Sequence, residues 1–253
     1  MEISAIIVPM PPRFSSLDGT LRIFAQPESG NTPNAEDWAR SISVEALLGL
    51  YLRAWLSVDN QLVFAPQRRV GSWLRSRDIA RHTRADLPEG ALGADQLVSV
   101  LAGGSSATPV AVYVDTQSVA TALAQQIAPL TDVTPLISVM APETELLHAF
   151  DPAATERILT TSTKGFTKTP EQEMNRLREE DIDGLGLAHN EWNGGLVALC
   201  HRFERRAVAH DLVHEREMAR VIDLGIDLAV SAHPQRLQAT ASLYYEFPET
   251  TEP

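Results

Sequence analysis

The sequence predicts an α/β protein that folds as a single (β/α)8 barrel, the TIM-barrel architecture. The chain has 253 residues, and one such barrel needs roughly 250. Short apolar runs rich in β-branched residues alternate with longer segments of helical spacing, the pattern of a parallel sheet with crossover helices. Eight such runs occur, which is the number that closes a barrel. An open doubly wound sheet has the same alternation and is the alternative fold.

The eight expected strands are short and mostly aliphatic. They cover residues 21–25, 50–58, 110–114, 136–140, 157–161, 184–188, 207–210 and 228–231. Helices are expected between them over 34–48, 118–130, 170–180, 215–224 and 234–243. Proline opens the helix at Pro170, with acids in its first turn, and Gly225 suits the left-handed position that follows a helix.

Two features depart from a plain barrel. Residues 58–61 form an expected tight turn and 62–65 return as a hairpin arm, a small insertion after the second strand. Residues 1–10 are expected to form an extra N-terminal strand. The domain prediction is therefore one domain over 1–253, with the barrel over about 20–245 and a disordered tail at 246–253.

Composition excludes several classes of protein. The net charge of −12 argues against a nucleic-acid partner, because phosphate backbones select basic surfaces. No stretch approaches the ~20 apolar residues of a membrane span, and the N-terminus lacks the basic region of a signal peptide, so we expect a cytoplasmic protein. The single cysteine, Cys200, lies in a run with the spacing of a buried helix face, where a core thiol is the expected role.

The order of motifs resembles the glycerophosphodiester phosphodiesterase family. That family carries Glu-x-Asp on its second strand, then Asp-Gly, then an apolar strand ending in His-Asp. Here Tyr51-Leu52-Arg53, Asp59-Asn60 and Leu62 to Gln67 occupy these places. The family's opening Ala-His-Arg-Gly corresponds to Ala25-Gln26-Pro27-Glu28.

The C-terminal part resembles the family most. Its Leu-Gly-Val-Asp…Pro pattern corresponds to Leu224-Gly225-Ile226-Asp227, followed by Pro234. The resemblance extends over residues 20–241 and is carried by order and spacing, since no single motif is intact. It implies a TIM barrel of the phosphodiesterase type, related to phospholipid metabolism.

This sequence differs from the family's pattern at the positions of the catalytic residues. The resemblance implies a divalent cation held by carboxylates, including the Glu-x-Asp pair, and two histidines as general acid and base. At the matching positions stand Gln26 and Pro27, Tyr51 and Arg53, and Pro66. None of these can supply the cation ligands or the proton transfer that a phosphodiester with a poor leaving group requires.

We therefore expect no catalytic residue, no metal and no cofactor, and a barrel that binds a small anionic molecule or another protein, with oligomerisation left open. A divergent active phosphoric diester hydrolase with a relocated site and a divalent metal is the alternative. An unrelated barrel enzyme, such as an isomerase, lacks a supporting motif.

Candidate ligand residues follow from the strand ends, because barrel chemistry lies at the carboxyl ends of the strands. They are Glu28, Arg53, Asp115, Lys164, His189, Asp211 and His233. His210 and His214 are spaced like a helical metal pair, but a strand-to-helix change is expected between them.

The segment 68–84 is the one basic island in an acidic chain. Arginine forks suit phosphates and carboxylates, so it is a candidate patch for an anion or a partner. The patch consists of Arg68, Arg69, Arg75, Arg77 and Arg81. The simpler interpretation is the solvated face of a helix whose arginines pair with nearby acids.

Overall fold

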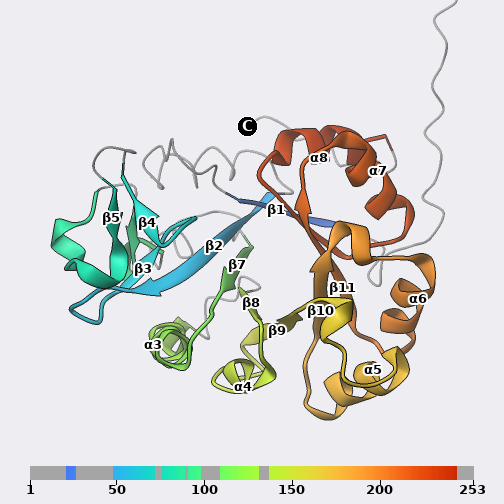
Figure 1. Cartoon of the computed structure of the whole chain (residues 1–253), viewed down its shortest axis with the longest axis horizontal. Coiled ribbons are helices and arrows are strands. Elements are labelled where there is room, and N and C mark those ends of the chain that lie inside the picture. Colours follow the sequence, from blue (N-terminus) through green and yellow to red (C-terminus); the bar gives the residue numbers. More distant parts are fainter. Residues whose placement is uncertain are drawn as a thin grey trace, which may run out of the picture.

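The computed structural model describes residues 21–26, 48–71, 76–88, 91–97, 109–130 and 137–243. Its centre is a closed barrel of eight parallel strands (Figure 1). These are β1 (Arg22–Ala25), β2 (Leu48–Leu56), β7 (Val110–Tyr113), β8 (Ile137–Ala141), β9 (Thr155–Thr160), β10 (Gly184–Ala188), β11 (Arg206–Leu212) and β12 (Leu228–Ser231). Each strand pairs with the next along the chain, and β1 pairs with both β12 and β2, which closes the ring. All eight expected strands are confirmed, and the open sheet is excluded.

Helices follow the barrel strands on the outside (Figure 1). They are α3 (Gln117–Ile127), α4 (Thr144–Leu147), α5 (Pro170–Glu179), α6 (Gly194–Arg202), α7 (Glu215–Asp223) and α8 (Pro234–Ala241). Four of the five expected helices are confirmed within a few residues; the short α4 was not expected. The expected helix over 34–48 falls almost wholly outside the described residues, and Leu48 begins β2. The expected N-terminal strand and the C-terminal tail also lie outside them.

The helix boundaries have local causes. Thr169 and Gln172 form a capping box at the start of α5, in which each side chain bonds the other's backbone. At the end of α7, Gly225 has φ 77°, and the amide of Ile226 donates to the carbonyl of Val221. This arrangement requires a left-handed residue, which glycine supplies without steric cost, as the sequence predicts.

Strand register divides the core into two parts. Side chains alternate along each strand, so every second residue points into the barrel. A separate buried cluster fills this interior: Phe24, Ala111, Met140, Ile158, Val208, Leu228 and Val230, with Tyr51 and Tyr113 packed against it. The larger cluster lies between the strands and the surrounding helices. The barrel is therefore filled by side chains, and it presents polar residues only towards its two ends.

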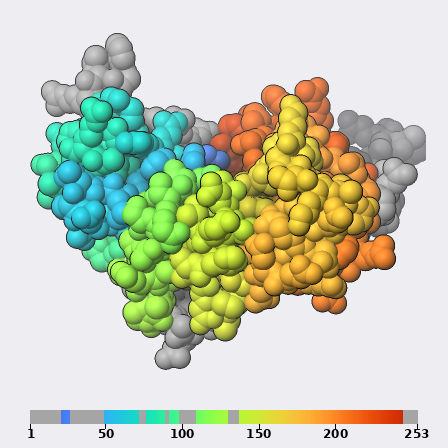
Figure 2. Space-filling model, turned by 60° about the horizontal axis from the view of Figure 1, so that its bottom comes forward, coloured from blue at the N-terminus to red at the C-terminus, as the bar shows by residue number. Residues whose placement is uncertain are grey.

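The insertion after β2 forms a small lobe with its own core. Strands β3 (Leu62–Phe64) and β6 (Leu92–Gly93) extend β2 in antiparallel fashion, and Asn60 takes φ 56° in the turn, as the hairpin prediction requires. Buried residues of the lobe form a third cluster: Val63, Ala65, Val70, Ile79, Leu87 and Ala91, with Trp55 beside them. Figure 2 shows the lobe, in cyan, projecting at one end of the molecule, away from the orange and red C-terminal helices.

The expected helix over the arginine island is wrong. In its described parts the segment forms a two-stranded sheet of β4 (Arg69–Val70) and β5 (Arg77–Asp78), followed by 3-10 turns at Ile79–Arg81 and Arg84–Asp86. The apolar residues that anchor it to the lobe core, Val70, Ile79 and Leu87, are eight or nine positions apart along the chain. That spacing anchors separate short segments and gives no continuous helical face.

The thiol of Cys200 is fully buried in α6, as predicted, and contacts the sulfur of Met174 at 3.5 Å. Burial, with a smaller contribution from Asp227, raises its pKa to about 12. Only the thiolate is reactive, so we expect no measurable modification of the folded protein by a thiol reagent at pH 8 and complete modification in urea. Fast labelling without denaturant would contradict the buried position.

No helix in the described part of the chain is long and apolar enough to cross a membrane.

Candidate functional site

The carboxyl end of the barrel is lined by polar side chains from several strands. Register places Tyr51 and Arg53 of β2 on the inward face, opposite Ala111 and Tyr113 of β7. The same alternation turns Thr160 of β9 and His210 of β11 inward. We call Tyr51, Arg53, Tyr113, Thr160 and His210 the mouth. Parallel strands bring these residues, distant in sequence, to one end of the barrel.

Arg53 is held by aromatic rings. Its guanidinium carbon lies 4.6 Å from the ring centre of Tyr113 and 5.4 Å from that of Trp55. Stacking of this kind favours arginine over lysine and fixes the plane of the guanidinium. Its Nε is buried and has no hydrogen-bond partner in the described structure. The mouth therefore contains an oriented cation with an N–H that lacks an acceptor.

The two tyrosines of the mouth stay protonated. Burial raises the pKa of Tyr51, against a smaller lowering by Arg53. Burial likewise raises the pKa of Tyr113, again partly offset by Arg53. Tyr51 also interacts electrostatically with Asp211. Residues of β2, β7 and β11 therefore interact at this end of the barrel, where two neutral phenols accompany a cation.

His210 and Asp211 form a contact at the opposite side of the mouth. His210 Nδ1 lies 2.9 Å from Asp211 Oδ2. The hydrogen bond from His210 is the largest cause of a lowered pKa at Asp211, and His189 contributes as well. His210 Nε2 is buried without a hydrogen-bond partner, and so is the hydroxyl oxygen of Thr160. Unpaired buried atoms also occur on Arg22 and Arg157, away from the mouth, but those of Arg53, Thr160 and His210 lie together at one end of the barrel. Buried polar atoms are normally paired, so this group favours a bound polar ligand.

His189 follows β10, and a network of backbone contacts positions it. Its Nε2 lies 3.8 Å from Glu217 Oε1, while its Nδ1 is buried without a partner. Arg220 donates to the carbonyl oxygens of His189 at 3.0 Å and Trp192 at 2.5 Å. The loop after β10 is thereby fixed to α7.

The remaining residues predicted from the sequence are not among the inward-facing residues of the mouth. Asp115 and Lys164 lie near strand ends but are exposed. Glu191 accepts hydrogen bonds from Ser162 and Thr163, which fixes the loop that carries Lys164 against the neighbouring loop. His233 lies at the end of β12, where its amide donates to Ser231 Oγ. Glu28 and Arg75 lie outside the described residues.

The island arginines point to solvent on the lobe. Arg68 pairs with Asp78 at 3.1 Å, and Arg69 donates to Ser76. Arg77 donates to the carbonyl of Asp86, and Arg81 interacts electrostatically with Asp78. Part of the island is therefore compensated locally, as the solvated-face interpretation expected, although the backbone is not helical.

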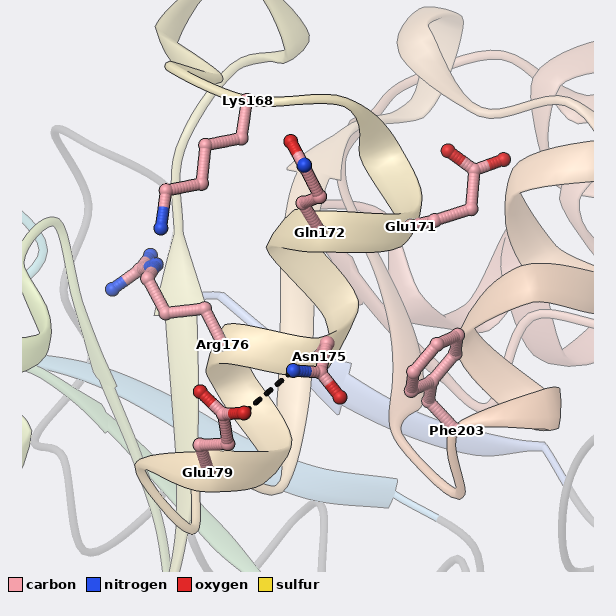
Figure 3. Close-up of a pocket in the computed structure, with 7 residues that line it drawn as sticks. All are labelled: Lys168, Glu171, Gln172, Asn175, Arg176, Glu179 and Phe203. Carbon is pink, nitrogen blue, oxygen red and sulfur yellow. Dashed lines mark hydrogen bonds between the residues drawn. The ribbon is translucent and has the colours of Figure 1, made fainter.

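A surface hollow of about 460 Å³ lies away from the mouth, over the outer face of α5. Figure 3 shows Gln172, Asn175 and Arg176 on this helix, with Phe203 beyond it. Its other lining residues are Lys168, Glu171 and Glu179. The hollow contains none of the unpaired buried atoms that mark the mouth, so we place the functional site at the mouth.

Sequence reasoning missed four members of the mouth as ligand candidates: Tyr51, Tyr113, Thr160 and His210. The signal that could have found them is the alternation of each strand, counted from the apolar residues that face inward. His210 was weighed only as a metal ligand with His214. In the structure β11 ends at Leu212, between these two histidines, and His214 is the N-cap of α7, so the pair does not lie on one helix.

Comparison with known proteins identifies the fold. No protein-family model and no curated protein sequence matches the chain. Solved structures do match. One is a proposed glycerophosphoryl diester phosphodiesterase from Silicibacter pomeroyi, with TM-score 0.74 and 13% identity over 95% of this chain and 98% of that one. The glycerophosphodiester phosphodiesterase of Thermotoga maritima gives TM-score 0.66 and 14% identity over 88% and 98%.

A third match is an Oleispira antarctica phosphodiesterase, whose structure holds the product sn-glycerol-3-phosphate. It gives TM-score 0.68 and 13% identity over 87% of this chain and 96% of that one. The chain therefore has the TIM-barrel fold of the glycerophosphodiester phosphodiesterases, in agreement with the resemblance found in the sequence.

The residues of the mouth do not fit the cation that the resemblance in the sequence implies. The inward positions of β2 hold a buried phenol and an arginine, where the resemblance places two carboxylates. A divalent cation needs several oxygen ligands, and an arginine beside it repels it. Within the described ranges, no three His, Cys, Asp or Glu side chains come together as a metal site.

The lowered pKa of Asp211 predicts a pH effect on stability. A carboxylate whose folded pKa lies below its unfolded value, about 3.9, stabilises the fold fully above that value and loses this contribution as pH falls through the folded pKa. We expect Asp211→Asn to flatten the acid side of a plot of unfolding free energy against pH between about 5 and 2. Urea titrations across this range would measure it. Parallel curves for the two proteins would contradict the assignment.

Proposed function

We propose that this protein is a barrel of the phosphodiesterase fold that binds a small anionic molecule at its mouth and does not hydrolyse phosphodiesters by the metal-dependent route. The observation that carries the proposal is the inward placement of Arg53 on β2, stacked on Tyr113 with its Nε unpaired. An arginine at this position repels a cation and attracts an anion. The unpaired buried atoms of His210, His189 and Thr160 support a polar ligand at the same end.

The alternative, a divergent active hydrolase with a relocated site, draws support from the contact between His210 and Asp211, since a carboxylate-held histidine also suits proton transfer. It requires turnover, and turnover is measured directly by the assay that closes the Discussion. A protein partner at the arginine island is the weaker candidate, because several of these arginines already have partners within the lobe.

Anion binding is tested by calorimetric titration in EDTA with glycerol 3-phosphate and D-glycerate, with glycerol as the neutral comparison. We expect both anions to bind saturably and glycerol not to bind. Arg53→Met should lower the affinity for both anions by about 10- to 100-fold, because a hydrogen bond to a charged group contributes roughly 1.5–3 kcal/mol.

Arg68→Met is the matched control, since Arg68 is an exposed arginine of the lobe. It should leave both affinities unchanged. The absence of binding by either anion, or equal affinities in wild type and Arg53→Met, would contradict the proposal.

A further inference from the structure

Strand β11 carries a bulge at the mouth. Its pairing with β12 passes from Ala209–Ala229 to Leu212–Ser231, so three steps on β11 match two on β12. The bulge contains Asp211, whose backbone is in the left-handed region with a φ of 63°. Ser231, which is buried, donates to the carbonyl of Leu212 at 2.8 Å and fixes the strand after the bulge.

The bulge brings together two side chains that a regular strand would separate. Neighbouring residues of a strand point to opposite faces, yet His210 and Asp211 meet at 2.9 Å. Positive φ is uncommon for residues other than glycine, and such backbone conformations concentrate at functional sites. Bulges beside sites commonly re-aim a side chain in this way.

The contact determines which nitrogen of His210 carries hydrogen. The pKa of Asp211 is lowered, mainly by its hydrogen bond with His210, so its carboxyl group is ionised near neutrality. An ionised carboxylate only accepts hydrogen bonds, which requires Nδ1 to be the donor. In the neutral imidazole Nε2 is then an acceptor, and it is buried without a partner. A ligand that satisfies it must bring a donor.

The opposite side of the mouth has the complementary requirement. Arg53 has donors only, and its unpaired Nε–H needs an acceptor. Register places both Arg53 and His210 at the carboxyl end of the barrel, facing inward, and Tyr51, two residues before Arg53, interacts electrostatically with Asp211 beside His210. A ligand that meets both carries an anionic group at one end and a hydrogen-bond donor at the other.

We infer that the ligand is a hydroxylated anion, whose charged group binds Arg53 and whose hydroxyl donates to His210 Nε2, with Asp211 as the residue that orients the imidazole. This inference rests on the proposed function and adds the chemical class of the ligand. It assigns His210 a binding role that requires no metal.

Matched probes test the hydroxyl. Glycerol 3-phosphate and n-propyl phosphate differ only in two hydroxyl groups, and D-glycerate and propionate form a second such pair. We expect the hydroxylated member to bind wild type about 10-fold more tightly, the contribution of roughly one well-made hydrogen bond. In His210→Phe the ratio of the two affinities within each pair should fall to about 1, while the affinity for n-propyl phosphate should equal that of wild type.

Asp211→Gly tests the positioning residue. Glycine accepts the left-handed backbone, so the variant should fold, and it should lose most of the preference for hydroxylated probes. Glu204→Gly is the matched control: Glu204 is an exposed acid with φ 57°, and its replacement should leave the ratio unchanged. Because the readout is a ratio within one variant, a general loss of stability does not imitate the effect.

The outcomes separate this inference from the proposed function. Equal binding of both members of each pair by wild type would overturn the inference and leave anion binding standing. The absence of binding by all four anions would overturn both. Nitrogen-15 spectra of the histidine rings give a test without ligand: they should show hydrogen on Nδ1 of His210 in its neutral form, and hydrogen on Nε2 would overturn the inference.

Discussion

Replacing Glu156 with alanine is expected to lower the free energy of unfolding by about 3–5 kcal/mol, the cost of breaking a buried ion pair from one side. Glu156 Oε1 lies 2.7 Å from Arg22 and also contacts Arg206, while Oε2 accepts from Ser138 at 2.5 Å. Register places these residues at the amino ends of the strands, facing inward, so they close the barrel end opposite the mouth. Removal of the Glu156 side chain leaves Arg22 and Arg206, both partly buried, without the carboxylate that they share.

Urea denaturation measures this loss. Glu171→Ala is the control, because Glu171 is an exposed acid of α5 and its removal should change stability by less than about 0.5 kcal/mol. A Glu156→Ala protein as stable as the control would show that the contacts of Glu156 with Arg22, Arg206 and Ser138 contribute little.

Replacing Trp192 with alanine is expected to cost a similar amount, about 3–5 kcal/mol, through the cavity left by a large buried ring. Trp192 follows β10, is 1% exposed, and donates from its indole nitrogen to the carbonyl of Val208 at 2.9 Å. The ring thus lies in the main core and connects the loop after β10 to β11.

Trp192→Phe separates volume from hydrogen bonding. It keeps most of the ring but leaves the Val208 carbonyl unpaired, so we expect a smaller loss of about 1–3 kcal/mol. Thermal or urea unfolding of both variants gives the comparison. A loss for the alanine variant no larger than that for phenylalanine would contradict the packing argument.

The fold was predictable because strand and crossover-helix patterns are local. Each strand is a short apolar run, and the ends of α5 and α7 carry the signals of a capping box and of Gly225. The arginine segment was mispredicted as a helix because its few apolar anchors pack into the lobe core, a contact between residues distant in the chain. Local charge pattern contains no information about such contacts.

The Leu-Gly-Ile-Asp segment, which resembles the family's pattern, has a structural role in this protein. Asp227 is 1% exposed, and its Oδ2 accepts from the amide of Ala207 at 2.7 Å and lies 2.9 Å from His201. These contacts join β12 to β11 and α6 at the amino end of the barrel, away from the mouth. The segment with the strongest resemblance therefore stabilises the fold and gives no information about chemistry.

The site was predictable only in part. Arg53 was found because it stands where the resemblance places a carboxylate, and Asp211 because it follows a strand, but the partnership of His210 with Asp211 depends on a bulge. A regular strand would turn those side chains apart, and no pattern in residues 206–212 announces the extra residue. Thr160 and Tyr113 were missed because inward orientation follows from register, which is fixed only when neighbouring strands pair.

Hydrolysis of glycerophosphocholine and glycerophosphoethanolamine by the purified full chain tests the central claim most directly. Release of glycerol 3-phosphate would be followed with Mg²⁺, Mn²⁺ or Ca²⁺ and with EDTA, on protein whose folding is verified by a cooperative unfolding transition. The account predicts no turnover above the protein-free rate under any of these conditions. Metal-dependent turnover that EDTA abolishes would contradict it and establish an active hydrolase with a relocated site.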